Sequence, residues 1–85
     1  MFKTCIPIKS KDKNRMITLL SEIELEAEKK GEKFDWYITV CDIKGYDNTI
    51  VIISESLNQA HKRGMWLIRK IPELRKSYYW VKPKD

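Results

Sequence analysis

Apolar and polar positions alternate near the start of the chain. Phe2, Ile6 and Ile8 share one parity. Lys3 and Cys5 lie on the other. Because the side chains of a strand point to alternate faces, this pattern predicts a half-buried strand.

The next segment follows the period of a helix. Four apolar residues recur at steps of four, three and four: Met16, Leu20, Ile23 and Ala27. This spacing places them on one face of a helix, whose first amide groups can donate to Ser10 or Asp12. Gly31 lacks the Cβ that penalises a left-handed backbone, so the helix is predicted to end there.

Two further strands are predicted to form a hairpin. Apolar and polar residues alternate from Phe34 to Cys41, in residue types that favour strands. A polar connection with Gly45, Asp47 and Asn48 leads into a run from Thr49 to Ile53. Because the last four residues of this run are all apolar, we expect its strand to be central and covered on both faces. Which face points to the core stays undecided at this point.

A second helix is predicted after this hairpin. Ser56 and Gln59 match a capping box. Apolar or small residues then form one helical stripe that ends before Pro72: Leu57, Ala60, Gly64, Leu67, Ile68 and Ile71. A glycine inside a helix costs about 1 kcal/mol of propensity, so Gly64 indicates a close approach of the helix backbone to the sheet.

The last strand completes a known order of elements. Tyr78 to Val81 is aromatic and β-branched, which predicts a short strand. The order βαββαβ, in a single domain of residues 1–85, predicts an α+β ferredoxin-like sandwich. Two helices would cover one face of a four-stranded antiparallel sheet with the order 4-1-3-2. Pro7 conflicts with this order unless it lies at the end of the pairing or the first strand is an edge, because proline removes a ladder hydrogen bond.

Composition limits the classes of protein that remain. A chain of 85 residues and 10.2 kDa has room for one core, and 42% apolar with 34% charged residues is typical of a globular domain. No apolar run approaches the roughly 18 residues that cross a bilayer. Lysines near the start stand where an export signal has its apolar stretch. We therefore expect a cytoplasmic protein without membrane contact.

The sequence contains no catalytic or metal-binding motif. His61 has no cysteine or carboxylate at a spacing that would orient it as a general base, and the three glycines are too far apart to cradle a phosphate. Cys5 and Cys41 are expected to be buried, reduced thiols. Four glutamates at steps of two over residues 22–28 indicate a solvated acidic face, which could also dock a basic partner. We expect neither enzymatic activity nor a cofactor or metal.

Charge is distributed unevenly along the chain, whose formal net charge is +5. Residues 16–32 carry five acidic and two basic side chains, whereas residues 51–85 carry eight basic and three acidic ones. On the second helix, opposite the apolar stripe and beside Gln59, five residues fall within about a third of the circumference: Lys62, Arg63, Trp66, Arg69 and Lys70. Cations can neutralise phosphates and an exposed indole can stack on a base, so this face is a candidate nucleic-acid site. The alternative is that Trp66 packs over the sheet edge and the lysine stems cover apolar surface.

A second basic and aromatic cluster lies near the C-terminus. Its members are Arg75, Lys76, Tyr78, Tyr79, Trp80, Lys82 and Lys84. Strand alternation sends Tyr78 and Trp80 to one face and Tyr79 to the other. If Phe34 and Trp36 point to the core, Tyr37 joins the first pair on the open sheet face. Such an aromatic face could stack bases, bind a protein or form the seam of a homodimer.

These observations favour a non-enzymatic, small basic binding module. We expect it to bind nucleic acid, either RNA or single-stranded DNA, or a nucleoprotein assembly, through the second helix and the basic C-terminal segment. The alternative is an inhibitor or adaptor that binds a protein partner through the aromatic face or the acidic first helix. In its lysine and isoleucine content the chain resembles small phage accessory proteins, which implies a phage-encoded inhibitor under this alternative.

Overall fold

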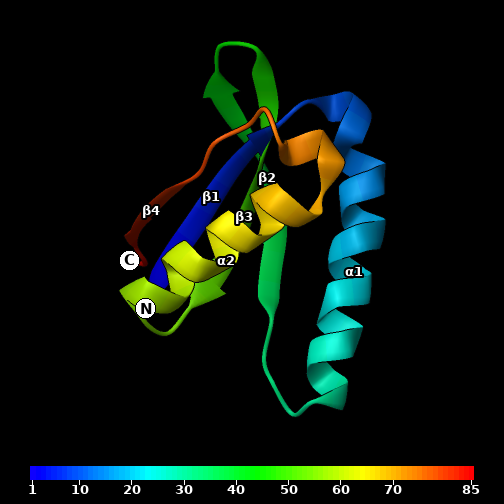
Figure 1. Ribbon diagram of the computed structural model, residues 1–85. Coiled ribbons are helices and arrows are strands. Elements are labelled where there is room, and N and C mark those ends of the chain that lie inside the picture. The colour runs from blue at the N-terminus through cyan, green and yellow to red at the C-terminus, as the bar shows by residue number, and fades with distance from the viewer.

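The computed structural model describes residues 1–85 as a four-stranded antiparallel sheet with two α-helices (Figure 1). The strands are β1 (Phe2–Ile8), β2 (Asp35–Ile43), β3 (Tyr46–Ser54) and β4 (Trp80–Pro83), and the helices are α1 (Lys13–Lys29) and α2 (Leu57–Lys70). Short 3-10 turns cover Ser10–Asp12 and Pro72–Leu74. The sheet order β2-β3-β1-β4 is the predicted order from the opposite edge, so the predicted α+β ferredoxin-like arrangement is confirmed.

The position of Pro7 is compatible with an internal β1. Pro7 pairs with Thr49 of β3, whereas the pairing of β1 with β4 ends at Cys5 and Trp80. The Pro7 carbonyl accepts a hydrogen bond from the hydroxyl of Ser77 at 3.0 Å, on the side of the segment that leads into β4. Since the N and O atoms of one strand residue point to the same side, the missing N–H of Pro7 faces a place where β4 has not yet begun.

The core combines alternate strand residues with both helices. Ten buried residues form one cluster: Ile6, Ile8, Met16, Leu20, Phe34, Ile50, Ile52, Leu67, Ile71 and Leu74. The even-numbered residues of β3 therefore face the core, which settles the parity left open by the sequence. Val51, on the opposite face of β3, is also only 4% exposed, as expected for a central strand. Leu57 differs from the prediction, because it lies in the first turn of α2 and is 49% exposed.

Local hydrogen bonds close the end of α1 and the start of α2. Gly31 has a φ of 72° and donates to the carbonyl of Glu28, while Glu32 donates to that of Ala27, which is a Schellman motif. Ser56 caps α2 by accepting from the amide of Gln59 at 3.1 Å. At the start of α1 the prediction was wrong. Neither Ser10 nor Asp12 caps the helix with its side chain. Ser10 instead donates from its amide and its hydroxyl to the carboxylate of Asp47.

Several strand boundaries also differ from the prediction. The hairpin turn is tighter, because Gly45 supplies a φ of 89° directly before Tyr46 and both Asp47 and Asn48 are already part of β3. β4 begins at Trp80 instead of Tyr78, since the chain first forms the second 3-10 turn.

Gly64 lies where α2 packs closely against Thr4 of β1 and the Tyr79 ring. A Cβ built on Gly64 would stand 2.7 Å from the Tyr79 ring and 3.0 Å from Cγ2 of Thr4. The hydroxyl of Thr4 also donates to the carbonyl of Ala60 in α2 at 2.8 Å. The predicted close approach of this glycine to the sheet is therefore confirmed.

Both cysteines are free thiols. Cys5 is buried, and burial raises its pKa. Cys41 is only half-buried and donates to the carbonyl of Asn48 at 3.3 Å, so the prediction of a buried thiol holds for Cys5 alone. Neither α-helix has the length and apolar character that crossing a membrane requires.

Candidate nucleic-acid interface

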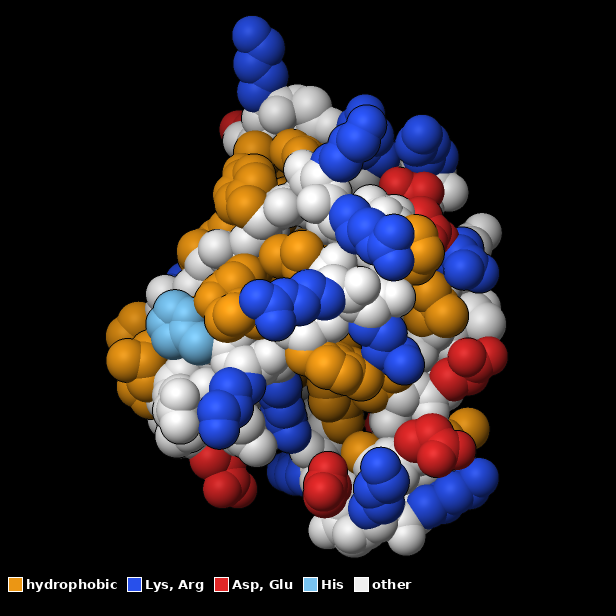
Figure 2. All heavy atoms as spheres, in the orientation of Figure 1, with side chains coloured by type: hydrophobic (Ala, Val, Ile, Leu, Met, Phe, Trp, Pro, Cys, Tyr) orange, Lys and Arg blue, Asp and Glu red, His pale blue; other side chains and the backbone are white.

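The outer face of α2 presents an aromatic ring among cations. Lys62, Arg69 and Lys70 are exposed, and Trp66 is 45% exposed. Together with Met65 they line a shallow depression of about 440 Å³, which we call the α2 surface. Figure 2 looks onto this side of the molecule and shows Lys and Arg side chains spread over it.

None of the three α2 cations of this surface forms an ion pair. The ion pairs of the molecule instead join Arg15 to Glu73, Lys29 to Glu26 and Lys33 to Asp35. On the α2 surface, the Lys70 ammonium instead makes a cation–π contact, 5.1 Å from the centre of the Trp66 ring. The surface therefore carries a positive charge that no carboxylate within the protein neutralises.

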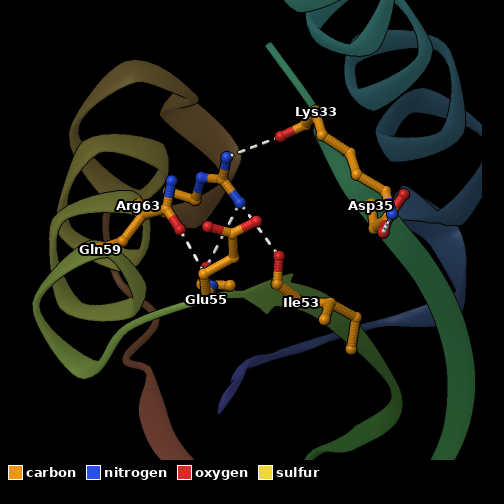
Figure 3. A network of polar contacts seen from close by, with 7 residues as sticks. Lys33, Asp35, Ile53, Glu55, Gln59 and Arg63 are labelled. Atoms are coloured by element: carbon orange, nitrogen blue, oxygen red, sulfur yellow. Dashed lines mark hydrogen bonds and ion pairs between the residues drawn. The ribbon is translucent and has the colours of Figure 1, made fainter. Parts of the chain in front are cut away.

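Arg63 does not join the outward cations, in contrast to the prediction. Its guanidinium donates to the carbonyls of Ile53 at 3.0 Å and Lys33 at 2.8 Å, and to the Ser54 hydroxyl at 3.3 Å (Figure 3). It also lies 5.4 Å from the centre of the Phe34 ring. Desolvation by burial lowers the pKa of Arg63 from its usual value. Arg63 thus ties α2 to the segment before β2 and to the end of β3.

The aromatic residues near the C-terminus lie on a different face. Four residues are consecutive partners across the whole sheet: Trp80, Cys5, Val51 and Tyr37. Most of their neighbours along the strands belong to the core or pack against it, so this row points away from the core. Tyr37 is 42% exposed, which agrees with its predicted place on the open face.

Tyr78 and Trp80 lie together, as predicted. Their ring centres are 5.9 Å apart, and Tyr46 adds an edge contact at 6.2 Å from Tyr78. Tyr79 points the other way, towards Gly64, and its hydroxyl lies 3.0 Å from Nδ1 of His61. The structure therefore divides the candidate aromatic residues between two faces.

The basic residues of this segment are all exposed: Arg75, Lys76, Lys82 and Lys84. Lys82 is the partner of Lys3 in the row next to Trp80 on the open sheet face. The open face thus combines two lysines with Tyr37 and Trp80, separately from the α2 surface.

A groove between α1 and α2 was not predicted from the sequence. It has a volume of about 600 Å³, and its apolar lining comes from both helices and from the segment before β2: Leu19, Ile23, Ala27, Phe34, Trp66 and Ile71. The two helices diverge in Figure 1, and an apolar area is visible between charged side chains in Figure 2. Trp66 and Lys70 line both this groove and the α2 surface.

One lip of the groove has mixed charge and the other is basic. The α1 lip carries Glu22 and Glu26 together with Arg15 and Lys30, whereas the α2 lip carries only the cations Arg63 and Lys70. Arg15 forms an ion pair with Glu73. Glu24, which lies between Glu22 and Glu26 in sequence, accepts from Nε1 of Trp36 at 2.6 Å and belongs to the packing of α1 on β2. The α1 glutamates are therefore not one uniform solvated face, because only some of them line the groove.

No group of three or more His, Cys, Asp or Glu side chains is placed to hold a metal ion. Comparison with protein families, curated proteins and solved structures finds no match to this chain. Three features can therefore carry a function: the α2 surface, the open sheet face and the groove.

Proposed function

We propose that this protein is a non-enzymatic binding module that holds single-stranded nucleic acid, or a nucleoprotein, on the α2 surface. The observation that carries the proposal is the half-exposed Trp66 beside three cations without ion-pair partners. Lysine and arginine release counterions from phosphates, and an indole stacks on any base. No nucleophile with an adjacent general base is among the five residues of this surface, which supports binding in preference to catalysis.

The cytoplasm is the compartment that we propose for this function. Cytoplasmic glutathione and thioredoxin keep thiols reduced, and both cysteines of the chain are free. A net charge of +5 also favours association with nucleic acid.

The substitution Trp66→Ala tests the proposal. We expect it to weaken binding of a fluorescent single-stranded DNA by about 1 to 3 kcal/mol, because one base loses its stacking partner. Replacing a fully buried tryptophan by alanine lowers the free energy of unfolding by about 3 to 5 kcal/mol. Since the Trp66 ring is 45% exposed, we expect a smaller loss here. Fluorescence anisotropy and urea unfolding measure the two quantities.

A pair of charge reversals supplies the control. Lys62→Glu with Arg69→Glu should abolish most binding, whereas Lys11→Glu with Lys13→Glu makes the same change in net charge outside the α2 surface and should weaken binding much less. If Trp66→Ala and the Lys62/Arg69 variant both keep full affinity, the binding site is not on α2.

The open sheet face supports a second candidate function, the binding of a protein partner or of a second copy of this chain. Tyr37 and Tyr78 are 42% and 48% exposed, and Tyr78 contacts Trp80. Aromatic residues of this kind often dominate protein interfaces. Under this alternative, Tyr37→Ala and Tyr78→Ala should abolish partner binding, or shift a dimer to a monomer in analytical ultracentrifugation, and leave the affinity for single strands unchanged.

A further inference from the structure

The groove between α1 and α2 lies directly beside the proposed strand-binding surface. Trp66 and Lys70 are common to both, so a strand whose phosphates contact Lys62 and Arg69 has its bases within reach of the groove. The volume of about 600 Å³ is within the usual range of small-molecule sites, and much of the lining is apolar. An unstacked base fits such a place, because it gains an aromatic surface on which to stack.

The polarity of the groove matches the polarity of a nucleotide. The α2 lip carries Lys70 and adjoins the cations that would take the phosphates. Across the apolar floor, the α1 lip carries the carboxylates of Glu22 and Glu26, and Arg15 and Lys30 also line this side. Arg15 is paired with Glu73. Glu22 forms no ion pair, and Glu26 has only an exposed contact of 3.4 Å with Lys29. A base that enters from the α2 side can therefore place its hydrogen-bonding edge against the carboxylates of Glu22 and Glu26.

A carboxylate distinguishes bases by their donors. It accepts from the exocyclic amino group of cytosine. Thymine and uracil present a carbonyl oxygen at the same position, which repels a carboxylate, and their one donor on this edge, the ring N3–H, lies between two carbonyl oxygens. We propose that the groove receives one base of the bound strand and selects bases with an exocyclic amino group over thymine or uracil, through Glu22 and Glu26. This inference rests on the proposed function of the α2 surface.

The matched probes are oligonucleotides of deoxycytidine and of deoxythymidine, each about twelve nucleotides long. The two have the same backbone, and both have single-ring bases, so they differ at the ring edge. Measured by fluorescence anisotropy at slightly alkaline pH, the cytidine strand should bind at least about fivefold more tightly. Equal affinities for the two strands, or tighter binding of the thymidine strand, would overturn the inference and leave the proposed function in place.

Two variants locate the selectivity. Glu22→Gln combined with Glu26→Gln should remove the preference for cytidine, because neutral amides no longer repel the thymine carbonyl. Glu28→Gln is the control, since Glu28 is an exposed α1 carboxylate outside the groove lining and its loss should affect both strands alike. An unchanged preference in the double variant would show that the groove does not read the base.

Failure of the proposed function has a separate signature. If neither strand binds at low salt, the α2 surface does not hold nucleic acid and the inference falls with it. The groove would then be assigned to a protein partner, for which its apolar floor and charged rim suit an amphipathic helix.

Discussion

Lys62 and Arg63 are neighbours in sequence with the same charge, yet the fold uses them differently. Lys62 is exposed and lines the α2 surface. Arg63 places its planar guanidinium against two carbonyls and a hydroxyl, a geometry for which its several N–H donors are suited. At the scale of single residues, the first is a candidate binding group and the second is a structural one.

Alanine substitutions at these two positions should therefore separate stability from binding. Arg63→Ala leaves carbonyl groups without donors, so we expect a loss of about 1 to 3 kcal/mol in the free energy of unfolding. Lys62→Ala should change it by no more than about 0.5 kcal/mol. Urea unfolding measures the free energy of unfolding of both variants. Equal losses in the two would contradict the structural role of Arg63.

The two thiols should also differ in reactivity and in their effect on stability. Because burial raises the pKa of Cys5, the folded state holds the thiol proton more tightly than the unfolded chain does. The resulting stabilisation is complete below the unfolded pKa of about 8.5 and is lost as pH rises through the higher folded value. An alkylating reagent at mildly alkaline pH should thus modify Cys41 well before Cys5.

Unfolding across this pH range supplies a second readout for the cysteines. The stability difference between the wild-type protein and Cys5→Ala should shift against the wild type as pH rises above about 8.5. Modification of Cys5 at the rate of Cys41, followed by mass spectrometry, would show that the Cys5 thiol is accessible.

At the scale of elements, regular patterns were predictable and contacts between elements were not. The alternation around Trp36 and the helical spacing from Met16 to Ala27 follow from local geometry, so they identify strands and helices before any tertiary contact is known. The end of α1 was equally predictable, because only glycine readily adopts the backbone that Gly31 has. The start of α1 was not, because Ser10 bonds to Asp47 in a distant hairpin.

In the candidate site, too, the local pattern was predictable and the contacts between elements were not. The helical period placed Lys62, Trp66 and Arg69 together, and the structure agrees. It could not show that Arg63 contacts carbonyls from two other segments. The groove depends on the angle between α1 and α2, which no local pattern encodes.

The contact of α2 with the sheet makes a test possible at Gly64. Alanine has the higher helix propensity by about 1 kcal/mol, but its Cβ would stand 2.7 Å from the Tyr79 ring. We expect Gly64→Ala to destabilise the protein by about 1 to 3 kcal/mol, because overpacking outweighs propensity. Thermal unfolding measures the change.

A double-mutant cycle with Tyr79→Leu identifies the cause. If the ring is the obstacle, Gly64→Ala should be less costly in the Tyr79→Leu background than in the wild type. A stabilising effect of Gly64→Ala in the wild type would contradict the close approach of α2 to β1.

At the scale of the whole molecule, charge makes binding depend on salt. For single strands, the logarithm of affinity falls with the logarithm of salt concentration by about 0.7 for each phosphate contact. The three exposed cations of α2 therefore predict roughly a 20-fold loss between 50 and 200 mM salt. If Arg75 and Lys76 also contact phosphates, the loss is roughly a hundredfold. Binding that does not change with salt would exclude phosphate contacts, and titrations with single-stranded DNA measure the slope.

The pairing of β1 with β4 brings the first and last residues together. Phe2 is the partner of Pro83, and the amide of Lys84 donates to the carbonyl of Met1 at 3.0 Å (Figure 1). In this antiparallel pair the ladder hydrogen bonds run across the strands, so a mechanical force applied to the two ends acts along those bonds. The hydrogen bonds then break one after another from the ends inwards. They would bear the force together only if the two strands were pulled along their axes in opposite directions. The molecule should therefore yield first at β4, which pairs with β1 over only four residues on each strand.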